Sequence, residues 1–178
     1  MIDAREEYVA AVGSPELLDG LSAMAMAADL LRSVRGAGAH VIHVRHVPGG
    51  HGGPPLRPGT TAIAIRPEVE PLPGEPVIAT RAAGAFAGTP LYRELADRDV
   101  ETVIIAGLMS ADSCSATACE AIERRLRTVL SSDATAARSG EPGEPSGVRD
   151  SALAVQRRRG AEVLSCESIA TLLGAATA

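Results

Sequence analysis

Short apolar runs rich in β-branched residues alternate along this chain with segments rich in Ala and Leu, and this alternation restricts the folds open to it. The run VETVIIAGL at 100–108 is unbroken, which is typical of a strand buried on both faces of a parallel sheet. Similar runs predict strands at 40–47, 76–80, 127–134 and 161–166. Because helical segments separate these runs, we expect βαβ units around a parallel sheet.

Helices are predicted over 14–38, 88–99 and 148–160, and a further helix is expected to open within AGLMSADSCSATACEA at 106–121. The segment 48–75 is rich in Pro and Gly, which predicts a long functional loop or lid.

Length and charge narrow the class of protein. A chain of 178 residues with 46% hydrophobic and 22% charged residues predicts a single globular domain over 1–178. The net charge of -5 argues against a nucleic-acid or membrane partner, so a small-molecule partner is expected. All 17 basic residues are Arg, which excludes Schiff-base, lysine-base and P-loop lysine chemistry.

Three cysteines without CxxC spacing indicate neither a disulfide framework nor a zinc knuckle. The first ten residues, MIDAREEYVA, are acidic and lack an apolar signal region, and no apolar run reaches the ~18 residues of a membrane span. These features predict a reduced, cytoplasmic protein.

Ligands of open parallel sheets bind beyond the carboxyl ends of the strands. The residues expected at those ends are Asp3, Arg45, His46, Thr80, Arg81 and the segment 107–114. We therefore expect these positions to converge on one site.

Several segments, in order, resemble the isochorismatase-like hydrolase superfamily. They are HVIHVRHV (40–47), LRPGTTAIAIRPEVEPLPGEPVIAT (56–80), GAFAGTPL (84–91), VIIAGLMSADSCSATACEAI (103–122) and ALAVQRRRGAEVLS (152–165). The resemblance implies a Rossmann-like, three-layer α/β/α fold around a six-stranded parallel sheet of order 3-2-1-4-5-6.

Amidase members of that family carry an Asp after the first strand, a Lys before a SAF-like triplet, and a Cys that opens a helix. Here the Asp position is Asp3, although only two residues precede it, and the Lys position falls on Thr80. Counting six residues from Gly107 puts the nucleophile position on Ser113, one place before Cys114. The resemblance therefore implies an atypical catalytic set of Asp3, Ser113 and Thr80.

True isochorismatases resemble this chain at another point. They protonate a vinyl ether for attack by water, need no thiol, and carry Gly followed by Cys where this chain has Ser113 and Cys114. That branch keeps the Lys, which this chain lacks.

Each candidate has an alternative interpretation. Asp3 is a general acid or base, or an Asp in solvent; Ser113 is a nucleophile, or a hydroxyl that opens a helix or holds a water. Cys114 is a thiol at a helix start, or a buried packing residue. Asp112 is expected to be a helix N-cap.

Arg45 and Arg81 are candidates to bind a substrate carboxylate, or are surface ion-pair partners. Phe86, the single Phe, is expected to wall the pocket or to pack in the core. The remaining candidates for substrate contact lie at the end of the 100–108 strand or after it: Leu108, Met109 and Cys114.

No cofactor or metal is expected, because His46 and His51 lack the acidic partner of the D-x-H motif in metal-binding family members. The resemblance also implies a homo-oligomer, a dimer or a tetramer.

The leading hypothesis is a hydrolase of a small carboxylate-bearing metabolite, with Asp3 as acid/base and water, or alternatively Ser113, as the attacking group. Two alternatives stay open: a diverged member that binds a ligand or partner without turnover, and a non-hydrolytic acid/base enzyme that carries out elimination or cyclisation in a biosynthetic pathway.

Overall fold

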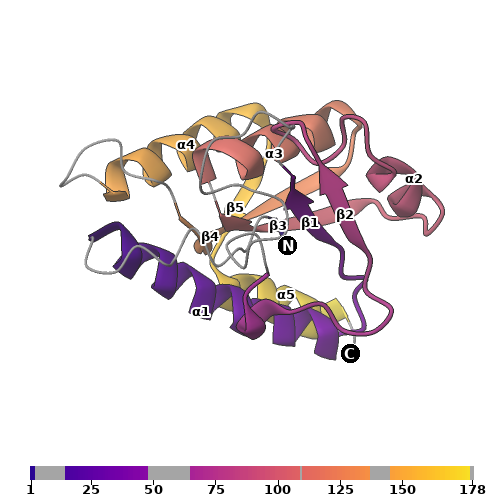
Figure 1. The fold of residues 1–178 in the computed structure, drawn as a ribbon, viewed down its shortest axis with the longest axis horizontal. Helices are drawn as coiled ribbons and strands as arrows, with labels where there is room; N and C mark the ends of the chain where they lie inside the picture. Colours follow the sequence, from indigo (N-terminus) through magenta and orange to yellow (C-terminus); the bar gives the residue numbers. More distant parts are fainter. Residues whose placement is uncertain (3–14, 48–64, 109, 137–144, 177–178) are drawn as a thin grey trace.

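A computed structural model describes residues 1–2, 15–47, 65–108, 110–136 and 145–176. Their strands form a parallel sheet between two layers of helices, with α1 and α5 on one face and α3 and α4 on the other (Figure 1). The predictions made for Asp3, His51 and Met109, and for most of the 48–75 loop, lie outside the described residues.

The strands fall on the predicted runs, mostly over fewer residues, whereas the two short helical turns were not predicted. The strands are β1 (His43–His46), β2 (Val77–Thr80), β3 (Thr102–Leu108), β4 (Arg127–Ala136) and β5 (Glu162–Leu164). The turns are a 3-10 helix at Pro67–Val69 and a π-helix at Ser110–Cys114.

The α-helices are α1 (Pro15–Gly36), α2 (Leu91–Ala96), α3 (Ser115–Glu123), α4 (Pro145–Arg159) and α5 (Cys166–Ala176). The last of these, α5, is absent from the sequence-based prediction. Its first turn is capped twice, since the Ser165 hydroxyl accepts the Ser168 N–H at 3.2 Å and the Asp133 carboxylate accepts the Cys166 N–H at 2.9 Å. No helix among the described residues is both long and apolar enough to cross a membrane.

The sheet consists of two parallel blocks, β1–β2 and β3–β4–β5. Ile2 lies between them and forms an isolated parallel bridge to Val44 of β1 and another to Gly107 of β3. The described residues therefore form five of the six expected strands, and the sixth position holds only this bridging residue.

Two apolar clusters cover the faces of the sheet. One joins α1 and α5 to the sheet through residues such as Met24, Leu30 and Ile169. The other joins α2, α3 and α4 to it through residues such as Leu95 and Ala118. Small residues on α3 let that helix approach the sheet closely, as its Ala-rich sequence indicates.

A buried polar cluster ties α1 to the amino ends of β1 and β2. Glu75 accepts hydrogen bonds from the Arg35 guanidinium at 2.7 and 2.8 Å, and lies 3.0 Å from Nε2 of His43. The Arg35 hydrogen bonds hold the pKa of Glu75 down to about 2. Burial lowers the pKa of His43 to about 4, so its imidazole is neutral in the folded protein near pH 7.

The stability of the fold is expected to fall as the pH falls from about 6.5 to about 4. Folded His43 stays neutral in this window whereas unfolded His43 takes up a proton, so acid favours unfolding. At about 1.4 kcal/mol per unit of pKa difference, we expect a loss of roughly 2 to 3 kcal/mol. Glu75 adds to the loss only below its ordinary pKa of 4.5. Urea unfolding at a series of pH values measures this loss of unfolding free energy.

The His43→Gln variant removes this titrating group, so the pH slope below about pH 5.5 should flatten, whereas the Met1 amine, whose pKa burial lowers to about 6, still contributes a slope above that pH. His40→Gln is the matched control, because His40 is exposed and should leave the slope intact. An unchanged slope in His43→Gln would show that another group titrates.

Candidate active site at the carboxyl edge of the sheet

The backbone of Ile2 is held at the carboxyl edge of the sheet between two strands. Its N–H donates to the Ala106 carbonyl at 2.8 Å, and its carbonyl accepts the Leu108 N–H at 3.1 Å. Gly107 lies beside it with φ of 135°, and a Cβ on Gly107 would overlap the Ile2 carbonyl. Only glycine therefore permits this close approach.

The segment after β3 enters α3 through the π-helix Ser110–Cys114. Such π-turns often occur at functional sites, because they redirect the residues of a helix start. Ser113 is half-buried in this turn. Asp112 is exposed within the same turn and the N-cap of α3 is Cys114, so the predicted N-cap role of Asp112 is wrong.

Cys114 is fully buried in the apolar cluster beneath the site. Its Sγ lies 3.6 Å from the carbonyl oxygen of Gly107. The structure therefore places Cys114 in the packing between α3 and the sheet, which is the second of its two interpretations.

Thr80, at the end of β2, is buried and its hydroxyl is used by its own turn. The hydroxyl lies 3.1 Å from the Gly84 carbonyl and 3.3 Å from the Ala82 carbonyl, and it accepts the Ala82 N–H at 3.1 Å. Thr80, at the position where the family resemblance implies a lysine, thus stabilises the turn that starts at Arg81.

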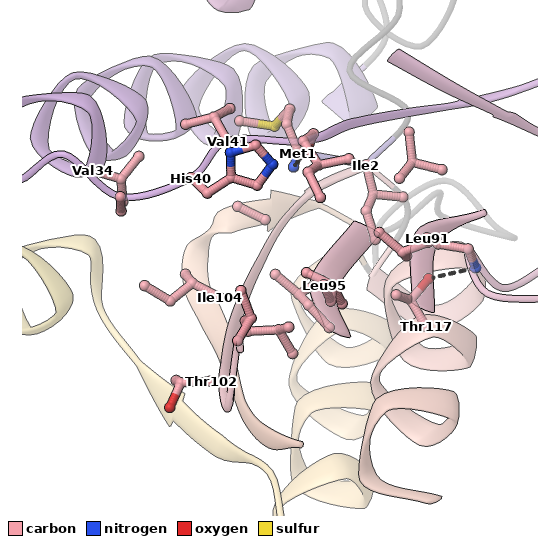
Figure 2. A pocket seen from close by; sticks show the side chains of 18 of the residues that line it. Met1, Ile2, Val34, His40, Val41, Leu91, Leu95, Thr102, Ile104 and Thr117 are labelled. Atoms are coloured by element: carbon pink, nitrogen blue, oxygen red, sulfur yellow. Dashed lines mark hydrogen bonds between the residues drawn. The ribbon is translucent and has the colours of Figure 1, made fainter. Parts of the chain in front are cut away.

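Two α3 side chains attach this turn to the helix that follows Ser113. The Thr117 hydroxyl accepts the Ala85 N–H at 3.1 Å (Figure 2) and donates to the Ser113 carbonyl at 2.6 Å. The Glu120 carboxylate accepts the Phe86 N–H at 2.9 Å, and the missing side chain of Gly84 leaves room for it.

These roles of Thr117 and Glu120 were not predicted from the sequence. Their spacing, three residues apart on one helix, puts both polar groups on the same face of α3. That spacing is the signal that could have identified them.

Phe86 and Leu108 are both buried in the core, at 5% and 2% exposure. The guanidinium of Arg124 lies 4.8 Å from the centroid of the Phe86 ring, a cation–π distance. Phe86 thus supports the turn from below, and it lines the cavity beneath the site that Figure 2 shows.

The two arginines differ in their surroundings. Arg81 is exposed. Arg45, at the end of β1, is half-buried, and its buried Nε has no hydrogen-bond partner among the described residues. An unsatisfied buried donor costs about 1 to 3 kcal/mol, so an acceptor that reached Arg45 would recover this energy.

An isochorismatase domain matches residues 1–168 of this chain. Among curated proteins, streptothricin hydrolase of Streptomyces noursei is 36% identical over 134 residues, which are 75% of this chain and 52% of that protein. Maleamate amidohydrolase of Pseudomonas putida is 30% identical over 158 residues, which are 81% of this chain and 74% of that protein. The chain thus spans about half the length of the streptothricin hydrolase.

Solved structures extend the likeness to the fold. An isochorismatase from Pseudomonas putida superposes with a TM-score of 0.82 at 32% identity, covering 94% of this chain and 87% of that one. A cysteine hydrolase from Pseudomonas syringae pv. phaseolicola has a TM-score of 0.88 at 20% identity, covering 99% and 91%. The second likeness concerns the α/β fold alone.

Proposed function

Because this chain belongs to the isochorismatase family, as its motifs predicted, we propose that it is a hydrolase of a small, carboxylate-bearing metabolite. The observation that carries the proposal is the pair of hydrogen bonds that hold Ile2 between Ala106 and Leu108. Asp3 follows Ile2 directly, and Ser113 lies in the turn that follows β3. Ile2 and the turn that holds the family's nucleophile position thus lie at one edge of the sheet, and Asp3 is the next residue after Ile2 in the sequence.

In this proposal, Asp3 is the general base and then the general acid. It takes a proton from a water molecule whose oxygen attacks the substrate carbonyl, and it returns that proton to the leaving group as the bond breaks. Ser113 positions the water, or in the alternative form attacks the carbonyl itself. Thr80 is a positioning residue, since its hydroxyl is bonded within its own turn.

Arg45 is the proposed recognition residue for the substrate. A guanidinium binds a carboxylate through two parallel hydrogen bonds, and the buried Nε of Arg45, which has no partner in the part of the chain that the structure describes, supplies one of the donors. Arg81, which is exposed, is proposed to contact the substrate only at the rim.

The first substrates to test are small carboxylates that bear an amide. The name of one relative, maleamate amidohydrolase, points to this class, and vinyl ethers form the second class because of the serine and cysteine at 113–114. A mass-spectrometric screen of both classes should find two products whose masses add up to that of the substrate plus one water. Products without added water would favour elimination or cyclisation instead.

With a substrate in hand, Arg45→Gln is expected to raise KM about 10- to 100-fold for the carboxylate and to leave KM for an uncharged analogue nearly unchanged. The expected size corresponds to one lost charge-assisted pair, about 1.5 to 3 kcal/mol. Arg93→Gln is the control, because Arg93 is highly exposed and its ion pair with Asp97 lies on the surface. Equal KM values for Arg45→Gln and the parent protein would remove Arg45 from the site.

The second candidate is a protein that binds such a ligand without converting it. The use of the Thr80 hydroxyl by its own turn favours this candidate, because no proton-transferring side chain occupies the family lysine position. Calorimetric binding of a carboxylate ligand without any product in the screen would support it over the hydrolase.

A further inference from the structure

The α4 groove is a cavity of about 470 Å³ between β4 and α4. Small-molecule sites in proteins measure roughly 300 to 1,000 Å³, so the groove has the size of such a site. None of its described lining residues belongs to the cavity beneath the candidate active site. All but one of them are polar or charged, which suits a polar ligand. They are Ser132 and Asp133 on β4, and Arg149, Asp150, Leu153 and Arg157 on α4.

The spacing of the α4 residues directs two guanidiniums to the groove. Arg149, Leu153 and Arg157 follow one another at intervals of four residues, so they form one row along the helix. Leu153, in the middle of the row, is buried in the apolar cluster that joins α4 to the sheet. The two arginines therefore lie one turn on either side of a residue that packs against the sheet.

Arg149 has a hydrogen-bond donor that the fold does not use. Only 27% of its side chain is exposed, and its buried Nε has no hydrogen-bond partner among the described residues. Oδ1 of Asp150 lies 3.6 Å from this Nε, which is an ion-pair distance but too long for a hydrogen bond. A buried donor without an acceptor is unfavourable, so an oxyanion that accepted this hydrogen bond after a small rotation of the side chain would stabilise the complex.

The two carboxylates that line the groove do not satisfy this donor. Oδ1 of Asp133 is engaged within the fold, where it accepts the Cys166 N–H at 2.9 Å and the Ser131 hydroxyl at 3.0 Å. The Asp150 side chain is 68% exposed, so water screens its charge. The charge that burial deprives of water is therefore the guanidinium of Arg149.

The chemistry of the groove favours a small oxyanion. A guanidinium binds phosphate or carboxylate through two parallel hydrogen bonds. Arg157 is exposed and supplies a second guanidinium, and the half-buried Ser132 supplies a hydroxyl donor on the opposite wall. The net charge of the chain is -5, so an anion is attracted by these local groups and not by the protein as a whole.

We propose that the α4 groove is a second binding site, which takes a small metabolite carrying a phosphate or a dicarboxylate group. Arg149 binds the oxyanion within the groove, Arg157 binds it at the rim, and Ser132 donates to it from β4. The groove is separated from Ile2 by β3. Binding there does not depend on the hydrolase reaction proposed above.

An NMR titration of the isotope-labelled full chain with inorganic phosphate, and separately with malonate, tests this site. The amides of Ser132, Asp133, Arg149 and Asp150 should shift and saturate with a Kd of about 1 mM or lower. Arg149→Gln should raise the Kd about 10- to 100-fold, because a charge-assisted pair is lost. Arg157→Gln, at the exposed rim, should raise it about 3- to 10-fold.

Arg158→Gln is the matched control, because Arg158 is exposed beside Arg157 and does not line the groove. It removes the same charge from the same helix turn and should leave the Kd unchanged. Arg45→Gln should leave it unchanged as well, since Arg45 belongs to the candidate active site. The spectrum of each variant also reports whether that variant is folded, and a misfolded Arg149→Gln leaves the comparison of Arg157→Gln with Arg158→Gln decisive.

A lower Kd for phosphate than for malonate would assign a phosphorylated ligand to the groove, and the reverse order would assign a dicarboxylate. Either order supports the site. The proposal is overturned if neither probe gives saturable shifts at these amides up to about 10 mM. Equal weakening by Arg157→Gln and Arg158→Gln, or shifts confined to the surroundings of Arg45, would also overturn it.

Discussion

The Asp3→Asn variant is expected to lose about 10²- to 10⁴-fold in kcat on the substrate found by the screen, the usual contribution of general acid/base catalysis. Asn has nearly the shape of Asp but neither takes up nor releases a proton near neutral pH. Ligand affinity should change much less, because the amide still fills the same volume. Steady-state kinetics together with calorimetric binding measure both quantities.

Ser113→Ala distinguishes the two forms of the mechanism. If water attacks the substrate, loss of the hydroxyl should lower kcat only several-fold, whereas a serine nucleophile would make the variant inactive. Asp112→Asn is the control, because Asp112 is exposed in the same turn and should leave kcat unchanged. Full activity in Asp3→Asn would remove the carboxylate from the reaction.

Gly107→Ala is expected to lower the free energy of unfolding by about 2 to 4 kcal/mol. The φ of 135° costs a non-glycine residue about 1 to 3 kcal/mol, and the new Cβ would overlap the Ile2 carbonyl. Relief of that overlap breaks the Leu108–Ile2 hydrogen bond, which adds about 1 kcal/mol. Denaturant unfolding measures the difference.

Gly147→Ala is the matched control for this change. Gly147 lies in α4, and a Cβ there meets no atom within 4 Å. The exchange should stabilise the protein by about 0.5 to 1 kcal/mol, because alanine is the better helix former. Similar stabilities of the two variants would mean that Ile2 does not lie against Gly107.

Strands could be predicted from the sequence where both of their faces are buried. The run at 100–108 reads as a strand because both faces of β3 are covered, and the observed β3 lies within it. The whole of α5 was missed, and one of its caps, Asp133, comes from a strand more than 30 residues away. The π-helix before α3 was also missed, because hydrophobic periodicity does not distinguish a π-turn from the first turn of an α-helix.

For the candidate site, the sequence predicted which residues lie at the strand ends better than it predicted the contacts of those residues. Parallel strands bring Arg45 and Thr80 to one edge by topology alone. The hydrogen bonds of the Thr80 hydroxyl depend on a turn geometry that residue spacing does not encode, and the burial of the Arg45 Nε without a partner among the described residues is likewise not visible in the sequence.

The Thr117 hydroxyl has a consequence for any attempt to redesign the specificity of this protein. Because this hydroxyl is hydrogen-bonded to Ala85 and to Ser113, the turn after β2 and the start of α3 are expected to move together. A residue inserted into that turn would also displace Ser113, which is the proposed nucleophile or water-positioning residue. Arg45 is outside this linkage, so the substrate recognition proposed for it is more readily re-engineered, at the end of β1.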